Sequence, residues 1–337
     1  MSIPPIVVMA AREGWRWQWQ QLMGGLGPAD RSGNYQRPRS DHLEAQLPEV
    51  TELSKRLPDQ RPGLIIGRSC PWAHRTWLVH QLRGLSNSLN LVIAQADHRA
   101  GRWILDPGWL GCTSLLDLYR RCQAPPSHRA TVPVLVDPGL GNDPCILGNE
   151  SAQLVELLNR WPATEHAPDL APKQHIDAID RWHRLLQPAV NDGVYRCGFA
   201  RNQAAYDRAE AALFDALKIV DHSLSENGPW LCGDQVSLAD VRLFPTLIRW
   251  EMVYSPLFGC SRQPLWQFPH LWEWRREFFA LPGVQQSCNG EAWRRDYFGA
   301  LFPLNPSGII PKAPDLTTLV NTPPLHSPDH EHGQRPF

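Results

Sequence analysis

The sequence is organised around one stretch, Gly67-Arg68-Ser69-Cys70-Pro71-Trp72-Ala73-His74-Arg75. An apolar run at residues 64–66 comes before it, and an amphipathic run that extends to Leu82 comes after it. This order predicts a strand, a tight turn and a helix. Pro71 suits the first helical position, where its missing N–H costs nothing, and Gly84 suits the position beyond the helix end. We therefore expect Cys70 at or next to the helix N-cap.

A cysteine at a helix N-cap meets free backbone N–H groups and the positive end of the helix dipole, which stabilise its thiolate. Thiol pKa values of ~3.5–7.5 occur in such settings. Cys70 is thus a candidate nucleophile, although a free cysteine is also a common core residue. Ala73 occupies the position that would complete a C-x-x-C pair, so Cys70 would need an external thiol to resolve a mixed disulfide. His74 and Arg75 either tune the thiolate or lie on the solvent face of the helix.

The bulk composition excludes several classes of partner. The chain has 337 residues with 33 basic and 34 acidic side chains, which disfavours nucleic-acid binding and a polybasic membrane contact. It has no apolar stretch of ~20 residues for a membrane span, and its start lacks the basic region of a signal peptide. Eight scattered cysteines, with no C-x2-C spacing, indicate reduced thiols in the cytoplasm and no zinc site.

Residues 1–60 lack sustained periodicity. We expect an arm that packs over the body and is anchored by Trp15, Trp17 and Trp19, with a disordered leader as the alternative.

Residues 61–161 have a mixed strand and helix pattern. Residues 91–94 are compatible with a second, parallel strand. Residues 97–128 are expected to be irregular, except for a helix from Ser114 to about Cys122. Two further strands are predicted at 131–136 and 145–147.

Two features of this half point to ligand binding. Pro133 within a predicted strand is informative if the Val132–Pro133 bond is cis, since backbone groups beside it are then free for a ligand. Glu150 and Ser151 begin an amphipathic helix, which is either a carboxylate-binding place or plain helix capping.

The rest of the chain is predicted to be helical. A proline-rich linker at 162–172 precedes apolar stripes in a region from 173 to 290, and Ser237 to Asp240 resembles a capping box. Residues 291–337 form a C-terminal extension. Its end is expected to be disordered, because the cluster His326, Asp329, His330, Glu331 and His332 lies among prolines, and we expect no metal site there.

The ordered set of motifs resembles the glutathione transferase superfamily, and more narrowly its Xi class, the glutathionyl-hydroquinone reductases. The resemblance covers roughly residues 14–312, and it includes the C-P-W-A stretch, 27–30, 131–135, 149–151, 191–195 and 305–309. It implies a thioredoxin-like α/β N-terminal domain followed by an all-helical glutathione-transferase C-terminal domain. It also implies a homodimer.

The resemblance also implies roles for individual residues. Cys70 would be the catalytic thiolate, and Tyr195 and Tyr297 would bind the hydroquinone and could supply a proton. Glutathione, as co-substrate and without a bound cofactor, would contact Trp103, Arg129, Val132, Pro133, Glu150 and Ser151.

The reaction that these roles imply removes glutathione from a glutathionyl-hydroquinone or a related aromatic conjugate. A Cys70–glutathione mixed disulfide forms, and a second glutathione resolves it to oxidised glutathione. Two other functions stay open. An omega-type thiol transferase or dehydroascorbate reductase would need the cysteine but not the tyrosines, and a glutathione-fold binding module would need no chemistry at all.

Overall fold

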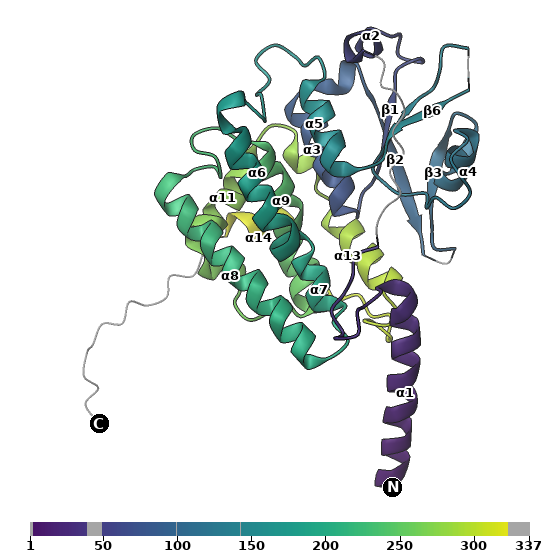
Figure 1. Cartoon of the computed structure of the whole chain (residues 1–337), viewed down its shortest axis with the longest axis vertical. Coiled ribbons are helices and arrows are strands. Elements are labelled where there is room, and N and C mark those ends of the chain that lie inside the picture. The colour runs from purple at the N-terminus through teal and green to yellow at the C-terminus, as the bar shows by residue number, and fades with distance from the viewer. Residues whose placement is uncertain (1–2, 39–48, 99, 142, 323–337) are drawn as a thin grey trace.

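The computed structural model describes residues 3–38, 49–98, 100–141 and 143–322. A sheet half and a helical half lie side by side, and one long helix projects away from them (Figure 1). The two halves match the predicted order of an α/β region before an all-helical one.

The described residues form a sheet of six strands in the order β4-β3-β2-β1-β5-β6. β1 and β2 are parallel, as predicted, and the other neighbouring pairs are antiparallel. All five residues of β1 are buried, which explains the unbroken apolar run before Cys70. The strands are β1 (Gly63–Gly67), β2 (Asn90–Asp97), β3 (Arg102–Trp109), β4 (Cys112–Ser114), β5 (Val134–Asp137) and β6 (Cys145–Gly148).

The expectation that residues 97–128 are largely irregular is wrong. They contain the β3–β4 hairpin, followed by the predicted helix as α4 (Leu115–Arg121). Pro107 and Gly108, both poor strand residues, fall inside β3, and the pairing register shifts between Ile104 and Trp109. These interruptions hide the strand period in the sequence.

Helix α3 (Pro71–Leu82) forms as predicted. Cys70 is its N-cap, and Gly84 adopts the left-handed conformation beyond its end, with φ 65°. The helix packs against α5 (Ser151–Arg160), α9 (Leu238–Leu247) and α12 (Val284–Ser287), so it is covered by both halves of the chain. The side chains of His74 and Arg75 are each 2 % exposed, and the solvent-face alternative for them is therefore wrong.

The helical half has a core rich in aromatic side chains. Phe244 stacks on Phe278 with ring centroids 4.3 Å apart, and Trp274 packs against both. The predicted capping box of Ser237 and Asp240 is present at the start of α9. The other helices are α2 (Val50–Ser54), α6 (Ile176–Leu186), α7 (Gly193–Gly198), α8 (Gln203–Asn227), α10 (Ser255–Phe258), α11 (Pro269–Ala280), α13 (Gly290–Ala300) and α14 (Leu316–Asn321).

The N-terminal arm differs from its prediction in one part. Its first part is a helix, α1 (Pro5–Leu26), that projects from the body (Figure 1). Trp19 packs against the core, but Trp15 and Trp17 are 44 % and 65 % exposed and anchor nothing in the described structure. The predicted anchoring by three tryptophans is therefore wrong for two of them.

The arm does return to the body after α1. Arg201 donates a hydrogen bond to the carbonyl oxygen of Gly27 at 2.7 Å, and Arg208 donates to the side chain of Asn34 at 2.8 Å. The ring of Tyr35 packs edge-on against Phe199. The segment after α1 therefore contacts the helical half through Gly27, Asn34 and Tyr35. The histidine-rich tail, 326–332, lies outside the described residues.

Candidate active site

A cavity of about 990 Å³ lies where the returning arm, the sheet half and the helical half meet. It brings together most of the site residues predicted from sequence. The described residues that line it include Tyr35, Arg37, Trp72, Arg75, Arg129, Val132, Pro133, Glu150, Ser151, Gln187 and Tyr195.

Cys70 has the predicted geometry at the start of α3. Its sulfur accepts a hydrogen bond from the Ala73 N–H at 3.5 Å and is 3.6 Å from the carbonyl oxygen of Val132, to which the thiol donates. The residue is half-buried. Cys70 therefore lies between the helix N-terminus and the segment before β5.

The predicted low pKa of Cys70 is not what this environment produces. Burial raises the pKa of the thiol, and it outweighs the N–H groups of Ala73 and Trp72 and the positive charges of Arg249 and Arg37, all of which lower it. The helix start does stabilise the thiolate, as expected, but the cost of removing a charge from water is larger. In the ligand-free structure the protonated thiol is the favoured form.

Five of the six predicted glutathione-binding residues line the cavity, namely Arg129, Val132, Pro133, Glu150 and Ser151. The Val132–Pro133 bond is cis, as anticipated. Glu150 is the N-cap of α5 and accepts a hydrogen bond from the Ala152 N–H at 3.2 Å, so the capping alternative holds in this structure. Ser151 follows directly and is buried. Carboxylate binding at this helix start stays a prediction.

Trp103 is the predicted residue that the structure sets apart from the rest. It lies on β3, opposite Ala96, and its ring covers the backbone of Gly67. A Cβ atom at Gly67 would lie 2.5 Å from that ring. Trp103 is not among the described residues that line the cavity. Cys70 and Tyr297 are not among them either, but each contacts a residue that is: Cys70 contacts Val132, and Tyr297 contacts Tyr195. Trp103 therefore has a clear packing role, and its contact with glutathione stays a prediction.

Three tyrosine hydroxyls form a chain beside the cavity. The hydroxyl oxygens of Tyr195 and Tyr297 are 2.6 Å apart, and those of Tyr254 and Tyr297 are 3.2 Å apart. Burial raises the pKa of all three hydroxyls, and for Tyr195 and Tyr297 the shift is large. All three hydroxyls are therefore protonated at neutral pH. Tyr254 was not singled out from the sequence, because it belongs to no motif there.

A cation–π cluster covers the ring of Trp72. The guanidinium carbon of Arg37 lies 3.9 Å from the ring centroid, and that of Arg75 lies 4.5 Å from it. Arg37 also pairs with Asp192 at 2.8 Å, and Trp72 stacks on Tyr195. No pattern in the sequence predicts this cluster, because Arg37 reaches Trp72 only through the fold of the arm. It makes this side of the cavity cationic and suits an acidic ligand.

Arg249 is a buried cation behind Cys70. It donates hydrogen bonds to Nδ1 of His74 at 2.9 Å and to the carbonyl oxygens of Pro245 and Arg68 at 2.9 and 3.4 Å. Its guanidinium lies 4.1 Å from the centroid of the Trp293 ring. Within the part of the chain that the structure describes, no carboxylate pairs with it. The sequence did not predict this residue, since it lies far from the cysteine along the chain.

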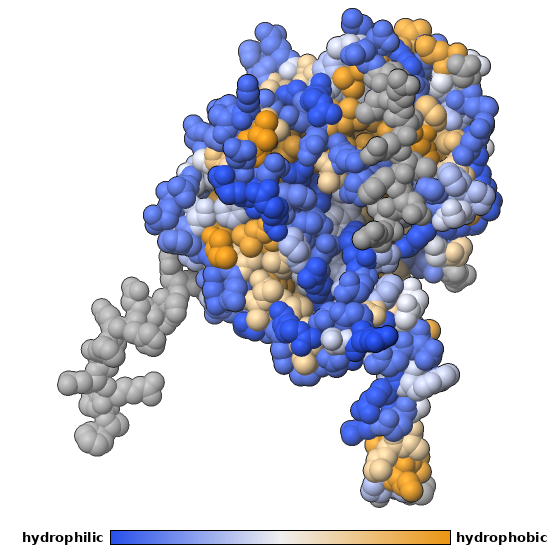
Figure 2. Space-filling view, in the orientation of Figure 1, coloured by the Kyte–Doolittle hydropathy of each residue, from blue (hydrophilic) through white to orange (hydrophobic). Residues whose placement is uncertain are grey.

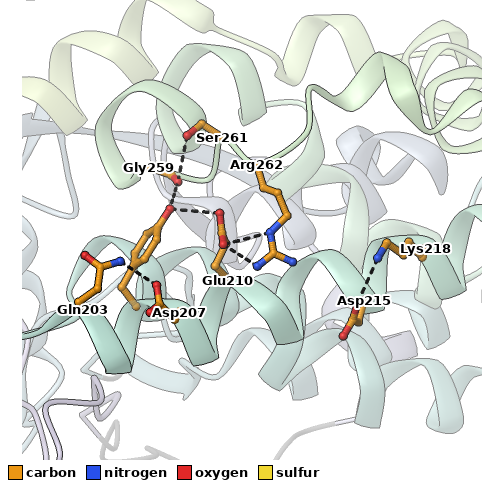
Figure 3. Close-up of polar contacts among 9 residues, drawn as sticks. Gln203, Asp207, Glu210, Asp215, Lys218, Gly259, Ser261 and Arg262 are labelled. Carbon is orange, nitrogen blue, oxygen red and sulfur yellow. Dashed lines mark hydrogen bonds and ion pairs between the residues drawn. The ribbon is translucent and has the colours of Figure 1, made fainter.

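A polar network joins α8 to the segment that follows α10. Tyr206 donates a hydrogen bond to the carbonyl oxygen of Gly259 at 2.6 Å, and Arg262 pairs with Glu210 at 2.6 Å. Figure 3 shows these contacts tying the segment at 259–262 to α8. The segment directly follows α10, so the network fixes the chain that carries Tyr254.

The described residues contain neither a candidate metal site nor a candidate membrane span. Among the described residues there is no group of histidine, cysteine or acidic side chains that could hold a metal ion. None of the described helices combines the length and the apolar character that crossing a membrane requires.

Comparisons with known proteins agree with this architecture. Residues 69–161 match the glutathione S-transferase N-terminal domain, and residues 203–277 match the glutathione S-transferase C-terminal domain. The chain is 31% identical to glutathionyl-hydroquinone reductase YqjG of Escherichia coli, over 75% of this chain and 79% of the relative. It is also 31% identical to glutathionyl-hydroquinone reductase PcpF of Sphingobium chlorophenolicum, over 75% and 83% of the two chains.

A solved structure leads to the same class. The Xi class glutathione transferase from Natrialba magadii superposes with a TM-score of 0.70 at 32% identity, over 78% of this chain and 81% of that one. The chain therefore belongs to the glutathione transferase superfamily, and within it to the Xi class, together with the glutathionyl-hydroquinone reductases. The family and the fold expected from the sequence motifs are confirmed.

Proposed function

We propose that the protein is a glutathionyl-hydroquinone reductase that works through Cys70. The observation that carries the proposal is the position of Cys70. Its sulfur lies 3.6 Å from the carbonyl oxygen of Val132, a residue that lines the cavity together with Glu150, Ser151 and Tyr195. Glutathione is a co-substrate, and a structure of the relative YqjG from Escherichia coli is described as glutathione bound.

The first step consumes the conjugate. The Cys70 thiolate attacks the sulfur of the glutathionyl-hydroquinone, an S–S bond forms, and the bond from that sulfur to the aromatic carbon breaks with its electron pair on carbon. The carbon takes a proton and hydroquinone leaves. Sulfur is oxidised to the disulfide level while the aromatic carbon is reduced, so electrons balance.

The second step restores the enzyme. A glutathione thiolate attacks the Cys70–glutathione disulfide, which gives oxidised glutathione and the Cys70 thiolate. Because no second cysteine stands at the position of Ala73, an external thiol must carry out this step.

Tyr195 and Tyr297 are proposed to bind the hydroquinone and donate the proton. Their raised pKa keeps both hydroxyls protonated at neutral pH, as a general acid requires. The hydroxyl contact of 2.6 Å lets one tyrosine replace the proton that the other gives up.

The cavity residues around Val132, Glu150 and Ser151 are proposed to hold glutathione. Val132 would pair its backbone with the cysteinyl part, Glu150 would take the ammonium, and Ser151 with the N–H groups of α5 would take the γ-glutamyl carboxylate. The arginines Arg37, Arg75 and Arg129 support binding of a tripeptide that carries two carboxylates.

The raised pKa of Cys70 sets a requirement for this proposal. The thiol must lose its proton in the presence of the conjugate, so turnover is expected to rise with pH through the neutral range. Peptide-resolved alkylation of Cys70 against pH, with and without glutathione, measures the thiolate fraction. A thiol that stays protonated well above neutral pH in both states would remove Cys70 as nucleophile.

The direct experiment is mass spectrometry after addition of a glutathionyl-hydroquinone. We expect one glutathione on Cys70 and free hydroquinone in solution, and neither with Cys70→Ser. Cys288→Ser is the matched control, because Cys288 is also half-buried and its pKa is raised to about 12. Hydroquinone release by Cys70→Ser at the normal rate would contradict the proposal.

The same assay separates the alternatives. An omega-type enzyme would turn over dehydroascorbate or a small mixed disulfide faster than the conjugate and would tolerate Tyr195→Phe. A binding module would bind glutathione without forming the adduct. A homodimer is a further part of the proposal, and sedimentation equilibrium measures it.

A further inference from the structure

The N-terminal part of helix α1, together with the two residues before it, is apolar on every side. Residues 3–11 contain no polar side chain, and residues 3–18 are all exposed. Ile6, Val7 and Met9 are 73 %, 52 % and 63 % exposed. Figure 2 shows this apolar surface gathered at the free end of the helix, away from the body. We call residues 3–11 the apolar tip.

The distribution of these side chains disfavours a protein partner. A helix that docks in a groove or pairs with a second copy presents a stripe at i, i+3, i+4 and i+7, with polar residues elsewhere. Consecutive residues of a helix point in directions about 100° apart. Ile6 to Met9 therefore cover the whole circumference of the helix, and all of them are exposed. A helix that is apolar all round needs an apolar surrounding on all sides.

The residues that follow the tip have the order found at a lipid–water boundary. Trp15 and Trp17 are exposed, and Arg12 and Arg16 lie beside them on the same two turns. Tryptophan and arginine are the side chains that settle at the interface, with the ring in the headgroup layer and the charge at the water. Helical residues 5–11 span about 10 Å, close to the ~5–10 Å to which interfacial segments enter a bilayer.

From these observations we propose that α1 is a membrane-surface anchor whose apolar tip enters one leaflet of an anionic lipid bilayer. Arg12, Glu13 and Arg16 are the only charged residues of α1, and Glu13 pairs with Arg16 at 2.7 Å. Arg12 thus contributes a net positive charge next to the tip, where it complements anionic headgroups. The sequence predicts no membrane partner, because it contains neither a polybasic segment nor a membrane span. The anchor proposed here is neither of these.

The test is flotation of the full chain with lipid vesicles. Vesicles of phosphatidylcholine and phosphatidylglycerol in equal parts are expected to carry the protein upward, and phosphatidylcholine vesicles are expected to carry less. The double variant Ile6→Glu with Met9→Glu should reduce the bound fraction about tenfold, because two carboxylates would have to enter the hydrocarbon. Arg12→Gln should reduce binding to the anionic vesicles alone.

Ile219→Glu is the matched control. Ile219 is an exposed apolar residue on α8, outside α1, and its replacement should leave flotation unchanged. All variants are surface changes away from the cavity, so their activity on a soluble conjugate should equal that of the parent, whatever the proposed reaction proves to be.

Three results would overturn the anchor. The first is a parent protein that floats with neither kind of vesicle, and the second is an Ile6/Met9 variant that floats as well as the parent. The third is a dimer, seen by sedimentation, that this variant abolishes without any change in the fraction bound to vesicles. The last result would assign the tip to a second copy of the chain.

Discussion

Arg249 donates a hydrogen bond to Nδ1 of His74 at 2.9 Å, and this contact fixes the state of the imidazole. Nδ1 must be the acceptor, so the ring proton is on Nε2 and is directed at the Ser287 hydroxyl, 2.8 Å away. Burial and the neighbouring Arg249 charge lower the pKa of His74 well below its usual value. His74 is therefore neutral, and both of its nitrogens are occupied by groups other than Cys70.

Arg249, rather than His74, is expected to favour the Cys70 thiolate. Its charge lowers the pKa of Cys70 and of Tyr297. Arg249→Met should raise the pH midpoint of Cys70 alkylation by about one unit, which is a tenfold loss of thiolate at a fixed pH below the midpoint. Peptide-resolved alkylation rates against pH measure this.

Two controls separate charge from structure at this position. Arg249→Lys keeps the cation and should hold the midpoint close to that of the parent, even though it loses hydrogen bonds. Ser287→Ala removes the hydroxyl that contacts Nε2 of His74 without removing a charge, and it should also leave the alkylation midpoint unchanged. Equal midpoints for the methionine and lysine variants would rule out the electrostatic role.

The buried histidines predict loss of stability in acid. Burial lowers the pKa of His74 and His80, and it lowers that of His183 to about 4. Below the unfolded value of ~6.5 the unfolded chain binds protons that the folded chain does not, so the free energy of unfolding falls as pH falls. Each fully shifted histidine contributes up to about 1.4 kcal/mol per pH unit in that range.

Urea midpoints at pH 7 and pH 5 measure the effect. The parent should lose stability between them, and His74→Gln, once corrected for its own cost at pH 7, should lose less. His222→Gln is the control, because His222 is exposed on α8. A parent midpoint that does not change between the two values would contradict the prediction.

The contact between Gly67 and Trp103 predicts a steric effect close to Cys70 in the sequence. Gly67→Ala should destabilise the fold by ~1–3 kcal/mol, because its Cβ would lie 2.5 Å from the indole ring. Thermal unfolding measures this, and Trp103→Leu in the same chain should recover part of the loss. Gly14→Ala, in the exposed middle of α1 with open space around it, should instead favour its helix. Equal effects at the two glycines would contradict the steric account.

The tyrosine chain predicts unequal effects of removing single hydroxyls. Tyr195→Phe or Tyr297→Phe should lower kcat on the conjugate by about 10²-fold, the usual contribution of a general acid. Tyr254→Phe should cost less, because the Tyr254 hydroxyl lies 3.2 Å from that of Tyr297, against 2.6 Å for Tyr195, and Tyr254 is not among the described residues that line the cavity. Steady-state kinetics on the conjugate, with dehydroascorbate as comparison, measure the three variants. Unchanged turnover for both Tyr195→Phe and Tyr297→Phe would remove the proton-donor role.

Local rules were enough to predict the framework of the site. The strand, the N-cap cysteine and helix α3 follow from about twenty consecutive residues, and so does the start of α5 at Glu150 and Ser151. Hairpin β3–β4 was missed because Pro107 and Gly108 break its period. Arg249 and Tyr254 were missed because only tertiary packing brings them to the site.

The pKa of Cys70 shows a different limit. The helix N-terminus was visible in the sequence, and its effect on the thiolate has the predicted sign. Burial was not visible, because it depends on how the helical half covers the start of α3. A local sequence pattern therefore predicts the effect of the helix N-terminus on the pKa of Cys70, but it does not predict whether burial outweighs that effect.

The burial of α3 has a consequence for how the chain can be divided. Residues from both domains cover nearly its entire surface, including Trp77, Leu78 and Val79, and its polar side chains Arg75 and His74 reach partners in the helical half. A fragment cut at the proline-rich linker would present that apolar and unpaired surface to water. The two domains should consequently melt in a single transition, and neither should be obtainable as an independent, well-behaved protein.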